Sequence, residues 1–155
     1  MSDGQLFAFE NDFVASLRCI PMAVRLKLDR AQIKLSLRQW SRLSRDDRQE
    51  LLDAPCGSRC EIDAYHAGLV DLIDRRACES AKPLAERPDP ALWEGLGEPP
   101  PVVTRYASSV GVAPPTAGQW RSLTDLQRYA LVKLTRDGHD NVNFIPAMRE
   151  FGLMS

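Results

Sequence analysis

The hexapeptide Gln39-Trp40-Ser41-Arg42-Leu43-Ser44 returns 80 residues later as Gln119-Trp120-Arg121-Ser122-Leu123-Thr124. The same offset pairs Pro21 with Pro101 upstream, and Arg48 with Arg128 and Leu51 with Leu131 downstream. Matching residue types at one fixed offset indicate an internal repeat, and two copies are too few for a solenoid. The sequence therefore predicts two similar helical halves that pack on each other.

Each copy of the repeat carries two helix-start signals, eight residues apart. A hydroxyl residue is followed three positions later by Gln or Asp in four pairs: Ser36 with Gln39, Ser44 with Asp47, Thr116 with Gln119, and Thr124 with Gln127. In such a capping box the hydroxyl accepts from a first-turn N–H, and the later side chain reaches back to the cap. We therefore expect, in each half, a short helix that carries a Trp and then a longer helix.

The first copy also contains an ambiguous segment. Polar and apolar residues alternate over 24–28 and again over 33–37, which is typical of strands and would fit a β-hairpin. The corresponding segment of the second copy, Pro101 to Gly111, has Pro where a first helical turn tolerates it and Gly where a helix ends. By analogy, the segment from Pro21 to about Ala31 is predicted to be helical.

The remaining pattern completes an all-α prediction. Apolar residues at helical spacing predict an amphipathic helix over 61–76, and short helices are expected near 13–17 and over 143–151. Residues 82–101 hold six of the eleven prolines. We therefore predict one helical domain over 1–155, with similar halves at about 10–80 and 100–153. A Pro-rich linker at about 82–100 would join them, held to the surface by Trp93 and Leu96.

The charge of the chain is unevenly distributed. The net charge is −1, yet residues 18–48 hold nine Lys or Arg and three acidic residues, so this stretch carries +6 and the rest carries −7. Such polarity favours docking to a charged partner, although solvated helix faces would give the same count. The sequence has no signal peptide and no apolar run of the ~20 residues that cross a membrane, so we expect a cytoplasmic protein with no membrane contact.

Few residues suggest a chemical site. Cys56 and Cys60 are separated by three residues, but a zinc site needs about four ligands, and neither His66 nor His139 is spaced to complete one. The pair is therefore a weak metal or redox candidate, and two reduced thiols in a loop are the simpler interpretation. No phosphate-binding loop, zinc-protease motif or nucleophile elbow occurs, which indicates a non-catalytic protein.

Three further sets of residues are first interpreted as structural. His139, Asp140 and Asn141 lie in a turn-rich loop that either forms a structural turn or contacts a partner. Trp40 and Trp120 are expected as core anchors between helices. Arg48 and Arg128 are expected to form ion pairs or to cap carbonyl groups.

Three separated segments carry a resemblance to a known family. They are residues 18–25, residues 33–40 with Gln39-Trp40 at their end, and residues 138–147 with the Asn143-Phe144-Ile145-Pro146-Ala147 run. In this order they resemble the nitrate reductase-associated protein family, over about Phe7 to Leu153. The resemblance implies an accessory to assimilatory nitrate reductase, a molybdenum enzyme. It supplies no catalytic residues, and no cofactor is expected.

Three hypotheses about function follow. The first is an accessory protein that docks on nitrate reductase through Arg38, Arg42 and Arg45. The second is a helical nucleic-acid-binding regulator, which the net charge of −1 disfavours because such proteins usually carry a basic footprint. The third is a small redox or metal-binding protein that uses Cys56 and Cys60.

Overall fold

The structure is a computed structural model that describes residues 6–10, 14, 16–85, 89–94, 97–136 and 142–154. Contacts divide the chain into two compact units, residues 1–88 (unit 1) and 89–155 (unit 2). The described elements of unit 1 are η1 (Ala8–Glu10), α2 (Met22–Ala31), β1 (Ile33–Lys34), α3 (Leu37–Arg42), α4 (Arg45–Asp53), α5 (Arg59–Ala77) and β2 (Lys82–Pro83). Those of unit 2 are η2 (Pro90–Leu92), α6 (Pro101–Ser109), α7 (Ala117–Ser122), α8 (Asp125–Lys133) and α9 (Phe144–Glu150). The predicted helical character is confirmed.

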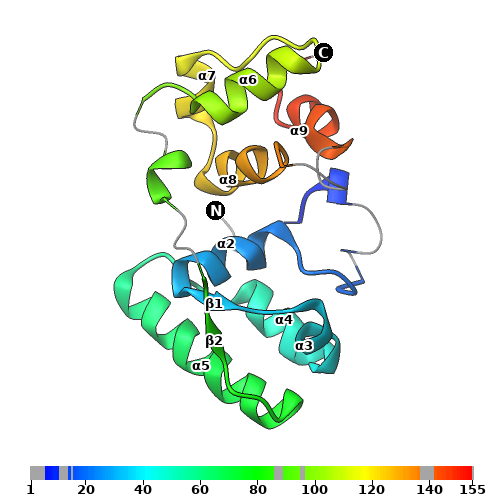
Figure 1. The fold of residues 1–155 in the computed structure, drawn as a ribbon, viewed down its shortest axis with the longest axis vertical. Helices are drawn as coiled ribbons and strands as arrows, with labels where there is room; N and C mark the ends of the chain where they lie inside the picture. The colour runs from blue at the N-terminus through cyan, green and yellow to red at the C-terminus, as the bar shows by residue number, and fades with distance from the viewer. Residues whose placement is uncertain are drawn as a thin grey trace. The chain divides into compact units, whose positions relative to one another are not determined.

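The long helix α5 organises unit 1. Helices α2 and α3 both pack against α5, and α2 also contacts α4 (Figure 1). The amphipathic pattern predicted over 61–76 is confirmed, because α5 buries the side chains of Tyr65, Leu69, Leu72 and Ile73. Trp40, on α3, is fully buried, as expected for a core anchor.

The ambiguous alternating segment is helical. Helix α2 runs from Met22 to Ala31 and ends at Gln32, which has the left-handed φ of 60°. The small sheet is a feature that the all-α prediction lacks. Ile33 and Lys34 pair antiparallel with Pro83 and Lys82, so the first residues of the predicted linker form part of unit 1.

Two side chains converge on the C-terminal end of α4. The Lys27 ammonium donates to the carbonyl oxygens of Leu52 (2.6 Å) and Ala54 (2.5 Å), and Lys27 is 2% exposed. The Tyr65 hydroxyl donates to the Leu51 carbonyl at 2.8 Å. The last carbonyls of a helix have no partner within the helix and carry the negative end of its dipole. A buried cation and a hydroxyl therefore fix α4 between α2 and α5.

The helix pairs α3–α4 and α7–α8 have the same local construction. Helices α7 and α8 begin 80 residues after α3 and α4 and have the same lengths, 6 and 9 residues. All four predicted capping boxes are present, with both reciprocal hydrogen bonds formed. The offset changes by one residue upstream, because Pro21 is the N-cap of α2 whereas Pro101 is the first residue of α6.

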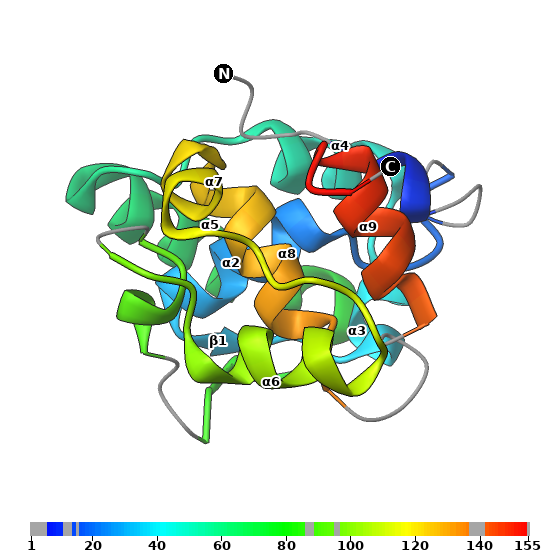
Figure 2. The ribbon, with the colours of Figure 1, turned by 90° about the horizontal axis from the view of Figure 1, so that it is seen from above.

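Helix α8 is the central helix of unit 2, in contact with α6, α9 and η2 (Figure 2). Aromatic rings make two edge-to-face contacts, Trp93 with Tyr129 at 5.1 Å between ring centres and Tyr106 with Phe144 at 4.9 Å. Trp93 is buried, as predicted, whereas Leu96 and residues 11–13 and 15 lie outside the described residues. Trp120 is also buried, like Trp40 in unit 1.

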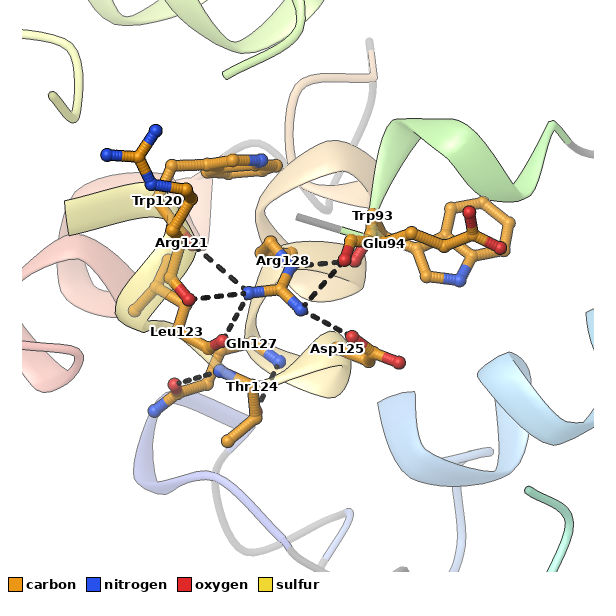
Figure 3. A network of polar contacts seen from close by, with 9 residues as sticks. All are labelled: Trp93, Glu94, Trp120, Arg121, Leu123, Thr124, Asp125, Gln127 and Arg128. Carbon is orange, nitrogen blue, oxygen red and sulfur yellow. Dashed lines mark hydrogen bonds and ion pairs between the residues drawn. The ribbon is translucent and has the colours of Figure 1, made fainter. Parts of the chain in front are cut away.

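One arginine in each unit holds the junction between the short and the longer helix. Arg48 donates to the carbonyls of Trp40 (3.1 Å) and Ser41 (3.2 Å) on α3, and to that of Leu17 (3.2 Å). Arg128 makes the corresponding contacts in unit 2, with carbonyl acceptors on Trp120, Arg121, Leu123, Trp93 and Glu94 and an ion pair with Asp125 (Figure 3). Both arginines therefore cap carbonyl groups, which confirms the structural interpretation.

Replacing Arg128 should destabilise the protein more than replacing Arg48. Arg128 is 5% exposed, so Arg128→Ala leaves several buried carbonyls without donors and should cost about 3–5 kcal/mol. Arg48 is only half-buried, and Arg48→Ala should cost about 1–2 kcal/mol. Urea unfolding followed by circular dichroism measures both. Arg128→Lys should not restore the stability of the wild-type protein, because one ammonium group cannot donate to the same set of acceptors. Arg121→Ala, at an exposed neighbour, is the control, and equal costs for all variants would contradict the assignment.

The capping carboxylate of Asp47 should make stability depend on pH. Burial alone would raise the pKa of Asp47, but hydrogen bonds from Ser44 and the ion pair with Arg76 (2.9 Å) outweigh it and lower that pKa. A lowered folded-state pKa stabilises above the unfolded value of 3.8, and this contribution disappears as the pH falls through the folded pKa. Asp47→Asn should therefore cost about 1 kcal/mol at neutral pH, and this cost should shrink progressively as the pH falls below 3.8. A pH series of unfolding free energies tests this, with Asp46→Asn as the matched control. A cost that is independent of pH would show that the charge is not involved.

Candidate functional site

The three arginines predicted to contact a partner lie on consecutive helices of unit 1. Arg38 and Arg42 are one turn apart on α3, and Arg45 is the first residue of α4. All three side chains are exposed. Leu37, beside Arg38, is 58% exposed, which is unusual for a leucine on a short helix. We call Leu37, Arg38, Arg42 and Arg45 the basic face.

The arginines of the basic face keep donor groups for a partner. Arg38 forms an ion pair with Glu79, and Arg45 donates to the Ser16 carbonyl at 2.9 Å. Arg42 has no polar partner among the described residues. An exposed ion pair contributes only about 0–1 kcal/mol, so exchanging it for a partner's carboxylate costs little. Each guanidinium has five N–H donors, and the contacts seen here use few of them.

Several other cations of the basic stretch over 18–48 serve the fold. Lys27 is buried against the end of α4, and Arg48 caps α3. Arg30 lies 3.4 Å from the Cys56 carbonyl. These cations contribute to the charge of +6, but burial or hydrogen bonds engage them within unit 1. The basic face is the part that projects from α3 and α4.

Unit 2 lacks a basic face at the matching positions. The residues found 80 positions after Leu37, Arg38, Arg42 and Arg45 are Ala117, Gly118, Ser122 and Asp125. The backbone elements there have the same lengths and the same caps as α3 and α4. The helix pair therefore forms without these arginines, and folding alone does not explain their presence in unit 1.

The two cysteines proposed as weak metal or redox candidates lie in different environments. Cys56 is 1% exposed, with its Sγ 3.8 Å from the Lys27 carbonyl, whereas Cys60 is exposed in the first turn of α5. Within the described ranges, no group of three or more His, Cys, Asp or Glu side chains is placed to hold a metal ion. The thiols therefore face different surroundings rather than a shared pocket.

The second set of partner candidates cannot be placed. His139, Asp140 and Asn141 lie outside the described residues, so their role as a turn or a contact stays a prediction. His66, by contrast, is described. Its Nδ1 lies 2.8 Å from the Ala31 carbonyl and, in the tautomer with a proton there, caps the end of α2.

A groove between α4 and α5 is a feature of unit 1 that the sequence did not predict. It has a volume of about 530 Å³. Its apolar wall includes Leu51 on α4 and Tyr65 and Leu72 on α5, and carboxylates such as Glu50 and Asp71 line its rim. The phenol of Tyr65 is neutral here, because burial and the nearby Cys56 raise its pKa.

Comparison with known protein families gives a match over most of the chain. A family model described as conserved nitrate reductase-associated protein matches residues 6–151. The chain belongs to this family. Comparison with curated proteins and with solved structures gave no significant match.

Membership in the nitrate reductase-associated family applies to both units, because the match runs from η1 to the end of α9. The family description links such proteins to nitrate reductase. In the described part of the chain, no helix is both long and apolar enough to cross a membrane. The family match confirms the resemblance noted from the three sequence segments.

Some features could not be found from sequence patterns. The capping box at Ser36 predicted that Leu37 lies on a helix, but no local pattern reported that its side chain is exposed. The groove needs α4 and α5 side by side, and no local pattern reports how two helices meet. Its one sequence signal is the spacing of Ala64 and Gly68, small residues one turn apart on α5.

The thiols should differ in reactivity. Iodoacetamide should alkylate Cys60 and Cys78 readily, and Cys56 at least about tenfold more slowly, because only the first two are exposed. Peptide mass spectrometry of a time course gives the rate at each site, and urea-unfolded protein is the control in which all sites react. Equal alkylation rates for Cys56 and Cys60 in the folded protein would contradict their different exposure and would favour the hypothesis that they act as a pair.

Proposed function

We propose that this protein is a non-catalytic accessory factor that docks on assimilatory nitrate reductase through the basic face of unit 1. The family membership supports the partner. The single observation that supports the surface is the exposure of three arginines and one leucine on α3 and α4, at positions where the matching helices of unit 2 carry none of them. On this proposal the protein works in the cytoplasm and needs no cofactor of its own.

The chemistry of the basic face defines the surface it would meet. Three guanidinium groups offer planar, bidentate donors that match carboxylates on the partner. Leu37 supplies an apolar contact among them, and buried apolar anchors with charged rims are typical of specific interfaces. We therefore expect an acidic patch with a shallow apolar depression on the reductase. Charge attraction of this kind mainly raises the association rate and falls with salt.

We also infer that the two units derive from one repeated helical half. The equal lengths and caps of α3–α4 and α7–α8 support this, together with the matched arginines Arg48 and Arg128. In this arrangement the shared helix pair provides the frame, and the side chains that differ between the copies provide the function. The Pro-rich stretch predicted as a linker lies between the two copies.

Unit 2 itself supplies the variant that tests the docking surface. Arg38→Gly, Arg42→Ser and Arg45→Asp together install the residues that unit 2 has at matching positions, so the fold should survive. We expect this triple variant to bind purified nitrate reductase at least about tenfold more weakly than wild type, with a smaller salt dependence. Surface plasmon resonance at two salt concentrations measures both effects.

A second triple variant controls for total charge. Arg121→Gly, Arg105→Ser and Arg149→Asp make the same change of charge at exposed positions of unit 2 and should leave binding unchanged. Circular dichroism confirms that both variants fold. Failure of the wild-type protein to bind the reductase would refute docking. Equal binding by all three proteins would refute the basic face as the contact.

A further inference from the structure

The groove between α4 and α5 has the shape of a helix-binding site. Its wall on α5 follows one stripe of the helix, from Glu61 through Ala64, Gly68 and Asp71 to Arg75. Spacings of three and four residues keep these side chains on one face, and the stripe extends for about 21 Å at 1.5 Å per residue. The wall on α4 follows a parallel pattern at residues 47, 50, 51 and 54. The α5 wall is thus long enough for a third helix of about 14 residues, and the α4 wall, which extends for about 10 Å, covers half of that length.

Small residues leave room for close approach along this stripe. Ala64 and Gly68 are exposed on α5, and Ala54 faces them across the groove from the end of α4. No atom lies within 4 Å of the position that a Cβ on Gly68 would occupy. Below this opening, the buried residues Leu51, Leu72 and Tyr65 offer apolar contacts. The groove is thus open at its surface and apolar at its floor.

Carboxylates surround the apolar floor. The lining holds four acidic residues and one basic residue, Asp47, Glu50, Glu61 and Asp71 against Arg75. Hydrogen bonds from Ser58 and Gly57 lower the pKa of Glu61, so this carboxylate is ionised at neutral pH. Glu50 has no ion-pair partner among the described residues. Asp71 pairs with Arg75 at 2.8 Å and Asp47 with Arg76 at 2.9 Å, so the net negative charge of the rim comes from Glu50 and Glu61. This charge favours a cationic occupant.

The groove and the basic face point in different directions. Arg45 and the groove residues Glu50, Leu51 and Ala54 share α4, but helical spacing places Arg45 on the opposite side of that helix. The two surfaces also have opposite charge. One contact patch on a partner therefore does not explain both, and the groove is a second, independent surface of unit 1.

From these observations we infer that the α4–α5 groove binds an amphipathic helix of a partner protein, with an apolar stripe flanked by Lys and Arg. The apolar stripe packs on Leu51, Leu72 and Tyr65, and the flanking cations meet Glu50 and Asp71 at the rim. This inference goes beyond docking through the basic face, because it concerns another surface and does not require the partner to be nitrate reductase.

A synthetic helical peptide tests the inference directly. The probe is a fluorescein-labelled peptide of about 14 residues, built from leucine, alanine and lysine, with lysines on both sides of a leucine stripe. A matched peptide has glutamate in place of every lysine. Fluorescence anisotropy with the full-length protein should show micromolar binding of the lysine peptide and no binding of the glutamate peptide.

The position of Gly68 allows the groove to be blocked without harming the fold. Gly68→Leu places a side chain in open space inside the groove, and replacing a helical glycine by leucine should not destabilise α5. We expect this variant to bind the lysine peptide at least tenfold more weakly, with a melting temperature no lower than wild type. Ala67→Leu is the matched control, since Ala67 is exposed on the same helix but does not line the groove. It should bind like wild type.

Charge variants distinguish a specific contribution of the rim carboxylates from general electrostatic attraction between the protein and the peptide. Glu50→Lys with Asp71→Lys should weaken binding at least tenfold, whereas Asp63→Lys with Asp74→Lys makes the same change of charge on α5 outside the groove and should weaken it less than threefold. Three results would overturn the inference: no binding of the lysine peptide, equal binding by Gly68→Leu and wild type, or equal effects of the two charge pairs. A small organic cation as the true occupant would give the first result. Loss of reductase binding in the basic-face variant has no effect on these measurements, so the two proposals fail separately.

Discussion

Helix ends impose the main constraint on this fold. Each unit joins a short helix directly to a longer one, and such a junction crowds unpaired carbonyls into a small volume. One guanidinium in each unit resolves this, since Arg48 and Arg128 donate to carbonyls at the end of the short helix and also to a carbonyl from the segment before the unit's first long helix. Loss of that guanidinium would leave buried acceptors without donors, at a cost that a domain of this size cannot easily absorb. The tryptophan of each short helix is buried, and the Arg48 guanidinium lies 5.8 Å from the Trp40 ring centre.

The opposite end of α4 has an equally specific solution. Lys27 and Tyr65 reach it from two different helices and donate to three carbonyl groups at its end, those of Leu51, Leu52 and Ala54. The angle between α4 and α5 is therefore set by polar contacts as well as by apolar packing. This explains how the groove stays open although its floor is apolar. Helices fixed at one end by hydrogen bonds cannot simply slide together to cover Leu51 and Leu72.

The division between frame and function follows from the comparison of the units. The caps, the tryptophans and the junction arginines occur in both and account for the shared backbone. Leu37, Arg38, Arg42 and Arg45 occur only in unit 1, on side chains that the fold leaves exposed. On the docking proposal, the surface specific to the reductase lies on unit 1 alone, and unit 2 shares only the helix pair that supports it. The net charge of the whole chain conceals this, because a basic face and an acidic groove lie on the same unit.

The sequence by itself determined the local elements of this protein. A capping box involves residues three apart, so all four helix starts could be read from Ser, Thr, Gln and Asp spacing, and the offset of 80 residues transferred the helical assignment from 101–109 to 22–31. Only the tertiary structure decided which charges are exposed. Lys27 and Arg42 contribute equally to a count of charges, yet one is buried against the end of α4 and the other projects from α3. The β1–β2 pairing joins residues 33 and 83, and Arg128 binds a carbonyl 35 positions away. Such contacts form only where segments that are distant in the sequence pack together. The free energy that stabilises this packing comes from burial and hydrogen bonding across the whole unit rather than from any local pattern.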